Sequence, residues 1–218
     1  MVLQMTGTHG LLLPEPVDAG LRVIALLICG HLLTRPSEAG RRILPAMTLL
    51  AAAVVGRIVL APIPSVQPMT MLLVLAGMRL GAQRGAALAI LATLLTNAVL
   101  GHGPWTYLQA TGWAFCAVAG GVLNDWLEPE DVPTKMLRMA LVGTVIGFLF
   151  GPWTILTDLL TATPSEAFAL VQGGWMFDVA HAASNVLTGL LILPMVDGWI
   201  RSRPSIDLAA ERRAPHEV

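Results

Sequence analysis

The chain has 218 residues, of which 55% are hydrophobic and only 12% are charged, whereas soluble domains average about 25% charged residues. The net charge of −1 gives no support for nucleic-acid binding. The single lysine, Lys135, follows no glycine-rich phosphate loop, so the chain carries no P-loop ATPase site of its own. The stretches 85–124 and 139–157 contain no Asp, Glu, Lys or Arg. Because a helix of about 20 apolar residues crosses a bilayer, the composition predicts an all-α membrane protein.

The apolar segments predict six transmembrane helices in one bundle, with these approximate bounds in chain order: 43–60, 69–80, 85–100, 105–127, 136–160 and 175–200. The second is short and follows a stretch that contains Pro62, Pro64 and Pro68, so we expect a structured loop that leads into a short helix. The apolar segment Leu21–Leu33 has only 13 residues. We expect it to lie at the membrane interface, although a seventh span stays open.

Positive charge predicts the orientation of this six-helix bundle. Twelve of the 13 Lys and Arg residues fall on one side of the predicted spans, and the thirteenth, Arg57, lies inside the first span. The positive-inside rule then places both termini in the cytoplasm. We expect an N-terminal cytoplasmic or interfacial segment over 1–40, the transmembrane domain over 41–200, and a disordered cytoplasmic tail over 201–218.

Small residues recur every four positions along several spans, which allows close contact between helix backbones in lipid. Gly143, Gly147 and Gly151 form one such stripe, and Ala52 and Gly56 form a shorter pair. We expect most of these residues to pack the bundle internally.

Five polar residues interrupt otherwise apolar segments: Arg57, Asn97, Asp158, Asp178 and His181. A charged side chain near the bilayer centre costs roughly 2.5–3.5 kcal/mol on insertion scales, so such residues usually face a polar cavity or a partner. In the predicted topology all five lie in the outer half of the membrane, and the cytoplasmic half has no comparable set. This arrangement favours the capture of a solute from outside.

Helical spacing brings further side chains to the same depth. Trp105, Gln109 and Trp113 follow one another at i, i+4 and i+8, and Asn185 shares a face with Asp178 and His181 at i+7. Aromatic walls with a few hydrogen-bonding groups are typical of small-molecule sites. The remaining candidates for this site lie in the outer loops or at the outer ends of spans: Gln67, His102, Trp153 and Trp175.

Structural roles are the alternative for each of these residues. The tryptophans at the ends of spans can belong to an interfacial belt: Trp105, Trp153 and Trp175. Asn97 can bridge two helices, and Arg57 can form a buried ion pair with Asp158 or Asp178. Asp178 and His181 could also bind a metal ion if His102 supplied a third ligand.

Three segments that contain these residues resemble one known family. They are Ile63–Thr70 (IPSVQPMT), Leu100–Thr106 (LGHGPWT) and Phe177–Asn185 (FDVAHAASN). Together they resemble the substrate-binding S-component of energy-coupling factor (ECF) vitamin transporters, over about Arg41 to Ile200, and most closely the members linked to cobalamin uptake. Typical members have Asn where this chain has Ser65 and Gly where it has Ser184.

The resemblance implies a six-helix bundle in a prokaryotic plasma membrane that captures a vitamin from outside, with a loop after the first helix that closes over it. The bundle would then dock on a transmembrane scaffold subunit coupled to two cytoplasmic ATPase subunits. The small-residue pair Ala52 and Gly56 matches the pattern with which family members contact the scaffold. The resemblance implies no enzymatic activity, cofactor or resident metal.

The resemblance also suggests roles for the candidate residues. Four tryptophans would line the pocket and stack on the vitamin: Trp105, Trp113, Trp153 and Trp175. Four amide side chains would hydrogen-bond the amides of the vitamin: Gln67, Asn97, Gln109 and Asn185. Asp178 and His181 would orient each other and contact the ligand, and Arg57 would meet a carboxylate or a ligand phosphate. His102 and Asp158 complete the predicted site.

Two other functional classes stay open from the sequence. A proton-coupled secondary transporter of a small polar solute could use Asp158, Asp178 and His181 as a proton relay. A membrane hydrolase would need a nucleophile with a general base, for which Ser65 is the nearest candidate, or a zinc motif that the sequence lacks.

Overall fold

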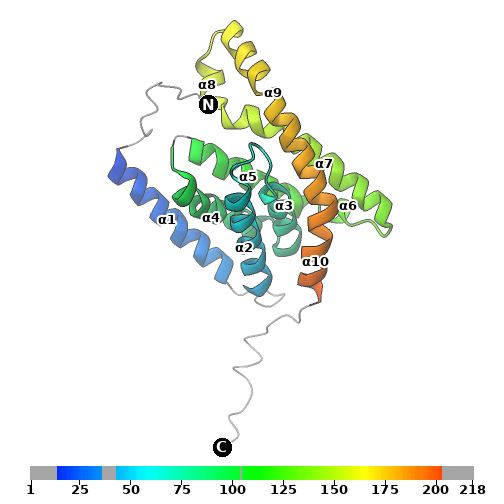
Figure 1. Cartoon of the computed structure of the whole chain (residues 1–218). Coiled ribbons are helices and arrows are strands. Elements are labelled where there is room, and N and C mark those ends of the chain that lie inside the picture. Colours follow the sequence, from blue (N-terminus) through cyan, green and yellow to red (C-terminus); the bar gives the residue numbers. More distant parts are fainter. Residues whose placement is uncertain (1–13, 36–42, 104, 203–218) are drawn as a thin grey trace, which may run out of the picture.

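A computed structural model of the chain describes residues 14–35, 43–103 and 105–202. Within these ranges the regular elements are all helical (Figure 1). Their bounds are α1 Glu15–Thr34, α2 Ile43–Leu60, α3 Met69–Leu80, α4 Ala82–Leu100, α5 Trp105–Val122, α6 Asn124–Leu127, α7 Val132–Thr154, α8 Leu156–Thr161, α9 Pro164–Leu187, a π-helical turn Thr188–Ile192, and α10 Leu193–Arg201. The predicted disordered tail lies outside the described residues from 203 onward, as does 1–13 of the N-terminal segment.

Five helical segments are long and apolar enough to cross a membrane: α1, α2, α4, α7 and the continuous stretch Pro164–Arg201. The helix α3 is apolar but has only 12 residues. The helix α5 has 18 residues, but polar side chains such as Thr106 and Gln109 lower its hydropathy. The chain is therefore an all-α protein in its described part, with the composition of a multi-pass membrane protein.

The central helix of the bundle is α3. Every residue from Met69 to Met78 is buried, because α2, α4, α5 and α10 surround this helix (Figure 1). A short helix enclosed by longer ones needs an apolar surface all round rather than one apolar stripe. Gly81, with φ +84°, ends α3 and allows the chain to turn directly into α4.

The helix α1 differs from the short interfacial segment that the sequence predicted. Tyr107, in the first turn of α5, donates a hydrogen bond to Asp18 in the first turn of α1. At its other end the Arg35 carbonyl accepts a hydrogen bond from Arg84, near the start of α4. The 20-residue helix α1 therefore runs beside α4 along the bundle (Figure 1). Its first turn and the last turn of α10 lie at opposite ends of the bundle, whereas the sequence placed both ends of the chain on one side.

The last two predicted spans also have different bounds. The predicted span 136–160 is divided, because α7 ends at Thr154 and the separate helix α8 follows. The last helix begins at Pro164 rather than Trp175, because Thr163 and Glu166 form a capping box around its first turn. The 38 helical residues from Pro164 to Arg201 correspond to about 57 Å, well beyond the ~30 Å hydrocarbon core of a bilayer. Accordingly α8 and the start of α9 project past the other helices (Figure 1).

Glycine contacts hold the long helices together, as the small-residue stripes predicted. A Cβ atom on Gly77 of α3 would overlap the Ala117 carbonyl of α5. Along α7, Cβ atoms at the three stripe positions would collide with α9: Gly143 with Asn185, Gly147 with Ala182, and Gly151 with the Asp178 carboxylate. The backbones therefore approach closely at Gly77, Gly143 and Gly147, which increases van der Waals contact between helices that gain little from hydrophobic burial in lipid.

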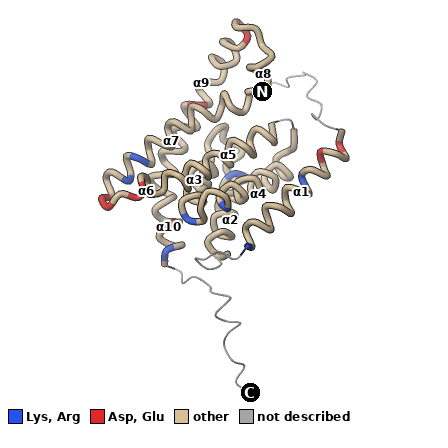
Figure 2. The backbone as a smooth tube through the Cα atoms, turned by 180° about the vertical axis from the view of Figure 1, so that it is seen from behind, with Lys and Arg blue, Asp and Glu red and all other residues tan. Residues whose placement is uncertain are grey.

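One end of the bundle gathers cations and is called the basic end below. It contains the last turns of α1, α3 and α10 and the first turns of α4 and α7, and Figure 2 shows charged residues around α6, the start of α7 and the end of α10. Arg79 donates to Asp197 Oδ2 at 2.7 Å and also to Glu128. Arg201 Nε lies 3.0 Å from Asp197 Oδ2, and Lys135 Nζ lies 2.9 Å from Glu128 Oε1. This five-residue network was not predicted from the sequence, because its members come from four separate segments.

The network predicts a pH-dependent contribution to stability. Partial burial alone would raise the pKa of Glu128, but hydrogen bonds from Arg79, Lys135 and Arg201 outweigh it and lower the pKa from 4.5 to about 2. A carboxyl group whose folded-state pKa is depressed stabilises the fold above its unfolded-state pKa and loses that contribution as the pH falls toward the folded value.

We therefore expect Glu128→Gln to lower the unfolding free energy by about 1–3 kcal/mol at pH 7, between the costs of breaking exposed and buried ion pairs. The difference between the two proteins should persist down to about pH 4.5 and shrink toward pH 2, as measured by thermal unfolding in detergent over this range. A difference that stays constant between pH 7 and pH 2.5 would contradict the assigned role of the Glu128 carboxylate.

Candidate functional site

The guanidinium of Arg57 lies inside the bundle near the end of α2 that is opposite the basic end. It is buried and donates hydrogen bonds to the Thr96 hydroxyl of α4 and to Gln109 Oε1 of α5, the latter at 3.2 Å. Its carbon Cζ lies 4.5 Å from the centre of the Trp113 ring, which is a cation–π contact. No ion pair joins Arg57 to Asp158 or Asp178 in the described part of the chain, so the predicted carboxylate pairing is not formed.

Asn97 extends this arrangement between α4 and α5. Its Nδ2 donates to Gln109 Oε1 and to the Thr106 hydroxyl, both at 3.0 Å. Gln109 Oε1 therefore accepts hydrogen bonds from both Asn97 and Arg57, which fixes the orientation of its amide. Asn97 Oδ1 is buried and has no hydrogen-bond partner among the described residues, so this acceptor is available to a donor group on a ligand.

A second chain of contacts connects α5 to α9 through α3. The indole N–H of the fully buried Trp113 donates to the Thr70 hydroxyl at 3.1 Å, and this hydroxyl lies 2.9 Å from His181 Nε2. Because Thr70 accepts from Trp113, its own proton can be donated to His181, which favours the neutral His181 tautomer with its proton on Nδ1. Phe150 of α7 packs against both rings, with centroids 5.0 Å from Trp113 and 5.2 Å from His181.

The cation–π contact joins these two sets into one network, called the polar network below. Its members come from α2, α3, α4, α5 and α9: Arg57, Thr70, Thr96, Asn97, Thr106, Gln109, Trp113 and His181. The structure thus brings together five of the predicted site residues: Arg57, Asn97, Gln109, Trp113 and His181. The sequence analysis did not assign Thr70, Thr96 or Thr106 to the site, although each adjoins a predicted site residue or lies in one of the three motifs.

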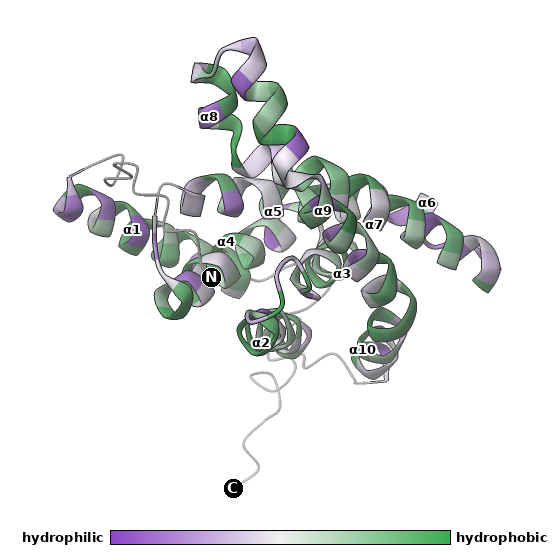
Figure 3. Cartoon of the chain, turned by 45° about the horizontal axis from the view of Figure 1, so that its top comes forward, coloured by the Kyte–Doolittle hydropathy of each residue, from purple (hydrophilic) through white to green (hydrophobic). Residues whose placement is uncertain are grey.

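The loop between α2 and α3 is attached to α9 by its backbone. The Gln67 amide donates to Ser184 Oγ at 2.9 Å, and Ser184 Oγ donates to the Gln67 carbonyl at 3.2 Å. Ser65 in this loop has φ +60°, a left-handed conformation that Asn adopts more readily than most residues. Ser65 and Ser184 thus both shape this loop. Figure 3 shows the loop arching from α2 toward α3 and α9.

Asp178 lies on α9 against the Gly151 backbone of α7. It is nearly buried and has neither a hydrogen bond nor an ion pair with another described side chain. One turn further, His181 bonds to Thr70, so Asp178 and His181 do not orient each other as predicted. A carboxylate in apolar surroundings without an intramolecular partner is available to a donor or cation on a ligand.

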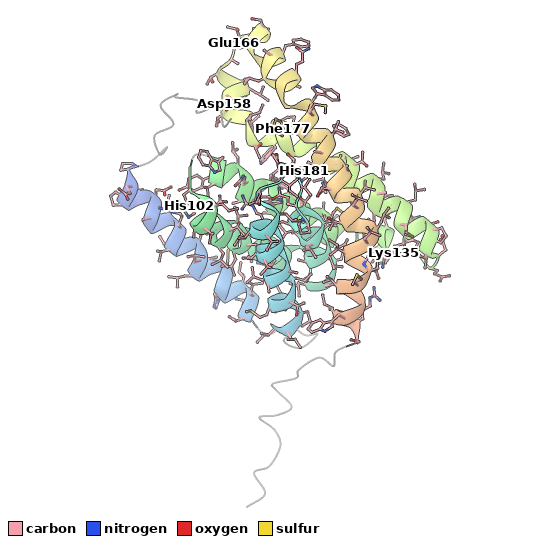
Figure 4. All side chains as sticks on the ribbon, viewed as in Figure 1. His102, Lys135, Asp158, Glu166, Phe177 and His181 are labelled. Atoms are coloured by element: carbon pink, nitrogen blue, oxygen red, sulfur yellow. The ribbon has the colours of Figure 1, made fainter. Side chains whose placement is uncertain are left out.

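Several predicted site residues lie outside the polar network. Asp158 is exposed on the projecting helix α8, and Figure 4 shows it well apart from His102 and His181. Trp105 and Trp175 are 43% and 54% exposed, as interfacial belt residues would be. The indole N–H of Trp153 donates to the Leu108 carbonyl at 2.8 Å, so this ring bridges α7 and α5.

Two further predicted residues have structural contacts. His102 Nδ1 lies 3.5 Å from the Thr106 hydroxyl, at the edge of the polar network. Asn185 Nδ2 donates to the Gly143 carbonyl at 3.0 Å, and its Oδ1 is buried without a hydrogen-bond partner among the described residues. Asn185 therefore fastens α9 to α7 and retains one free acceptor.

The small-residue pair on α2 faces the interior of the bundle. A Cβ atom added to Gly56 would overlap the ring of Pro68, and Ala52 packs against the hydrophobic core. The exposed stripe of α2 is formed instead by large residues that recur every four or eight positions: Met47, Val55 and Val59. A scaffold contact through Ala52 and Gly56 stays a prediction.

The described residues contain no group of three or more His, Cys, Asp or Glu side chains placed to hold a metal ion. The three residues of the metal hypothesis, His102, Asp178 and His181, are therefore not brought together. The polar network, with its amides, hydroxyls, one guanidinium, one imidazole and one indole, instead suits an organic ligand with hydrogen-bonding groups.

Comparison with known proteins identifies no relative of this chain: no family model matches it, and no curated protein or solved structure is significantly similar. The functional assignment depends on the site and on the motifs that surround it.

The environment of Arg57 predicts the effect of removing its charge. In Arg57→Met no polar group loses its last partner, because Gln109 Oε1 still accepts from Asn97 and the Thr96 hydroxyl still donates to the Ala92 carbonyl at 2.8 Å. Replacing buried charges by apolar groups of similar volume is often neutral or stabilising. We therefore expect the unfolding temperature of the purified variant to equal or exceed that of the wild type. A destabilisation of more than about 3 kcal/mol would show that Arg57 mainly holds the bundle together.

Proposed function

We propose that this chain is a vitamin-binding S-component of an ECF transporter, which captures a corrinoid such as cobalamin from outside and delivers it through an ATP-driven complex. The observation that carries this proposal is the polar network, where five predicted site residues from four helices meet at one depth. A cluster of amides, hydroxyls and a cation inside an apolar bundle costs folding energy, and such a cluster is typical of a ligand site or of a contact that specifies the packing. Corrinoids present many amide groups, which such side chains can bind, and cobalamin also carries a phosphate that could meet the cation.

The basic end supports an orientation with this end in the cytoplasm. It contains Arg35, Arg79, Arg84, Lys135 and Arg201, as the positive-inside rule requires. The polar network then lies toward the outer surface. In this orientation α1 would add a crossing to the six predicted spans, and the first turn of α1 would lie on the outer side. Among the described cations, only Arg22 would then change from the cytoplasmic to the outer side. Arg22 forms an ion pair with Asp18 at 2.8 Å.

The loop 61–68 supports a gated site. The polar side chains of the network are bonded to one another, and the loop is fastened across α9 by Gln67 and Ser184. In our proposal this backbone contact opens to admit the ligand and closes over it. Asp178, Asn97 and Asn185 then supply the carboxylate and amide oxygens that have no intramolecular partner.

The remaining steps would belong to partner proteins. The chain would dock on a scaffold transmembrane subunit with two cytoplasmic ATPase subunits, in a prokaryotic plasma membrane. A proton-coupled transporter is the alternative, but the exposed position of Asp158 on α8 removes one member of the proton relay on which that hypothesis depended.

Uptake of labelled cobinamide tests the proposal in cells that lack their own corrinoid transporter and produce this chain together with an ECF scaffold and its ATPases. We expect Asp178→Asn to reduce uptake about 10–100-fold, the loss that corresponds to one charge-assisted hydrogen bond. The matched control is Asp125→Asn, at an exposed carboxylate on α6, which should leave uptake unchanged. Uptake that survives ATP depletion but collapses with a protonophore would contradict the S-component proposal and favour the proton-coupled transporter.

A further inference from the structure

An apolar groove lies at the basic end between α3, α7 and α10. Its volume is about 270 Å³, slightly below the 300–1,000 Å³ of enclosed small-molecule sites, so an occupant would lie partly outside it. Most of its lining is aliphatic: Leu75, Met78, Val132, Met136, Met139 and Leu193. Such a surface suits a hydrocarbon chain rather than a polar solute.

The π-helical turn Thr188–Ile192 shapes one wall of this groove. Pro194 has no N–H to donate, and its ring would clash with a carbonyl four residues earlier in a regular α-helix. The chain relieves this by a wider turn, in which the Leu193 amide donates to the Thr188 carbonyl five residues back. Gly189, Pro194 and Gly198, on and after this turn, line the groove. The two glycines have no side chain and the proline ring is compact, so this wall leaves the groove open.

Three cations surround the groove: Arg79, Lys135 and Arg201. Two carboxylates, Glu128 and Asp197, pair with them, so three positive and two negative charges leave a net charge of +1. The charge also remains accessible, because the side chain of Arg201 is 53% exposed and that of Lys135 is 33% exposed. Both cations are therefore accessible to an anion from the surface of the protein, in addition to their carboxylate partners.

Tryptophans near the groove indicate its depth in the membrane. Trp126 of α6 and Trp199 of α10 are both more than a third exposed. The guanidinium of Arg138 lies 5.0 Å from the Trp126 ring centre. Tryptophan with neighbouring cations is typical of the level of the lipid headgroups. Cation-rich pockets between transmembrane helices at this level bind anionic headgroups.

We propose that this groove binds one anionic phospholipid of the adjacent leaflet, with an acyl chain along the aliphatic wall and the phosphate against Lys135 and Arg201. The charge balance favours an anionic headgroup over a zwitterionic one, and the aliphatic lining distinguishes a lipid from a free phosphate ion. This proposal does not depend on the vitamin-binding function.

Native mass spectrometry of the full chain in detergent, titrated with phosphatidylglycerol, tests the proposal. We expect one tightly bound phosphatidylglycerol, weaker binding of phosphatidylcholine, and no displacement by inorganic phosphate. Gly198→Leu fills the groove without touching the ion pairs, since no atom lies within 4 Å of a Cβ built there, and should weaken binding about tenfold or more. The matched control is Gly20→Leu on α1, which also has open space around its Cβ and should bind like the wild type.

Lys135→Gln tests the headgroup contact separately. We expect about fivefold weaker binding of phosphatidylglycerol, which is the effect of losing one cation near an anionic lipid surface, and no change for phosphatidylcholine. Equal binding of the two lipids by the wild-type chain would overturn the proposal, as would wild-type affinity in both variants. Displacement of the lipid by millimolar inorganic phosphate would also overturn the proposal, and it would show that the groove binds a free anion.

Discussion

The guanidinium of Arg57 is buried in an apolar bundle without a carboxylate partner among the described residues, and much of the surrounding structure follows from this constraint. Its donors must be bonded within the bundle, because unsatisfied charge in such surroundings costs several kcal/mol. The partners are the hydroxyl of Thr96, the amide of Gln109 and the ring of Trp113. They come from α4 and α5, so α2 must meet both helices at this depth.

A second constraint positions the other wall of the site. The three glycines of α7 bring its backbone into contact with α9, and this contact holds Asp178 and Asn185 on the inner face of α9. His181 lies between them and reaches Thr70 on the central helix α3. Without the close glycine contacts α9 would stand further from α7, and the contacts of Phe150 with His181 and of Asn185 with the Gly143 carbonyl could not form. Helix packing and the polar chemistry of the site are therefore coupled.

Much of this arrangement was predictable because helical periodicity and depth are both readable from the sequence. Arg57, Asn97 and Gln109 each lie within about one turn of a helix end on the same predicted side, so their meeting required only that the helices be neighbours. The start of α9 was also predictable, since Thr163, Pro164 and Glu166 are a capping box with proline in the first turn. Counting apolar residues instead placed that start at Trp175.

Other features depend on contacts between segments far apart in the chain. Only the 13-residue apolar segment Leu21–Leu33 of α1 was evident in the sequence, and this segment begins after Asp18 and contains Arg22. In the structure these two residues pair with each other, and Asp18 also accepts from Tyr107, so the helix extends past them. The position of Asp158 was likewise not predictable, because the helix breaks after α7 and Asp158 lies on the projecting helix α8. The ion-pair network of Arg79 was not predictable either, because its partners are 49 and 118 positions away.

The most direct test of the central claim is an isothermal titration of the purified chain alone, in detergent and without ATP, against a vitamin panel that includes cobalamin and cobinamide. If the chain is an S-component, as we propose, it binds its vitamin before it meets its ATPases, so we expect binding of one corrinoid per chain at nanomolar concentration. Binding of a different vitamin would keep the mechanism and change the substrate. Failure of a folded chain to bind any member of the panel would contradict the claim that the polar network is a vitamin site.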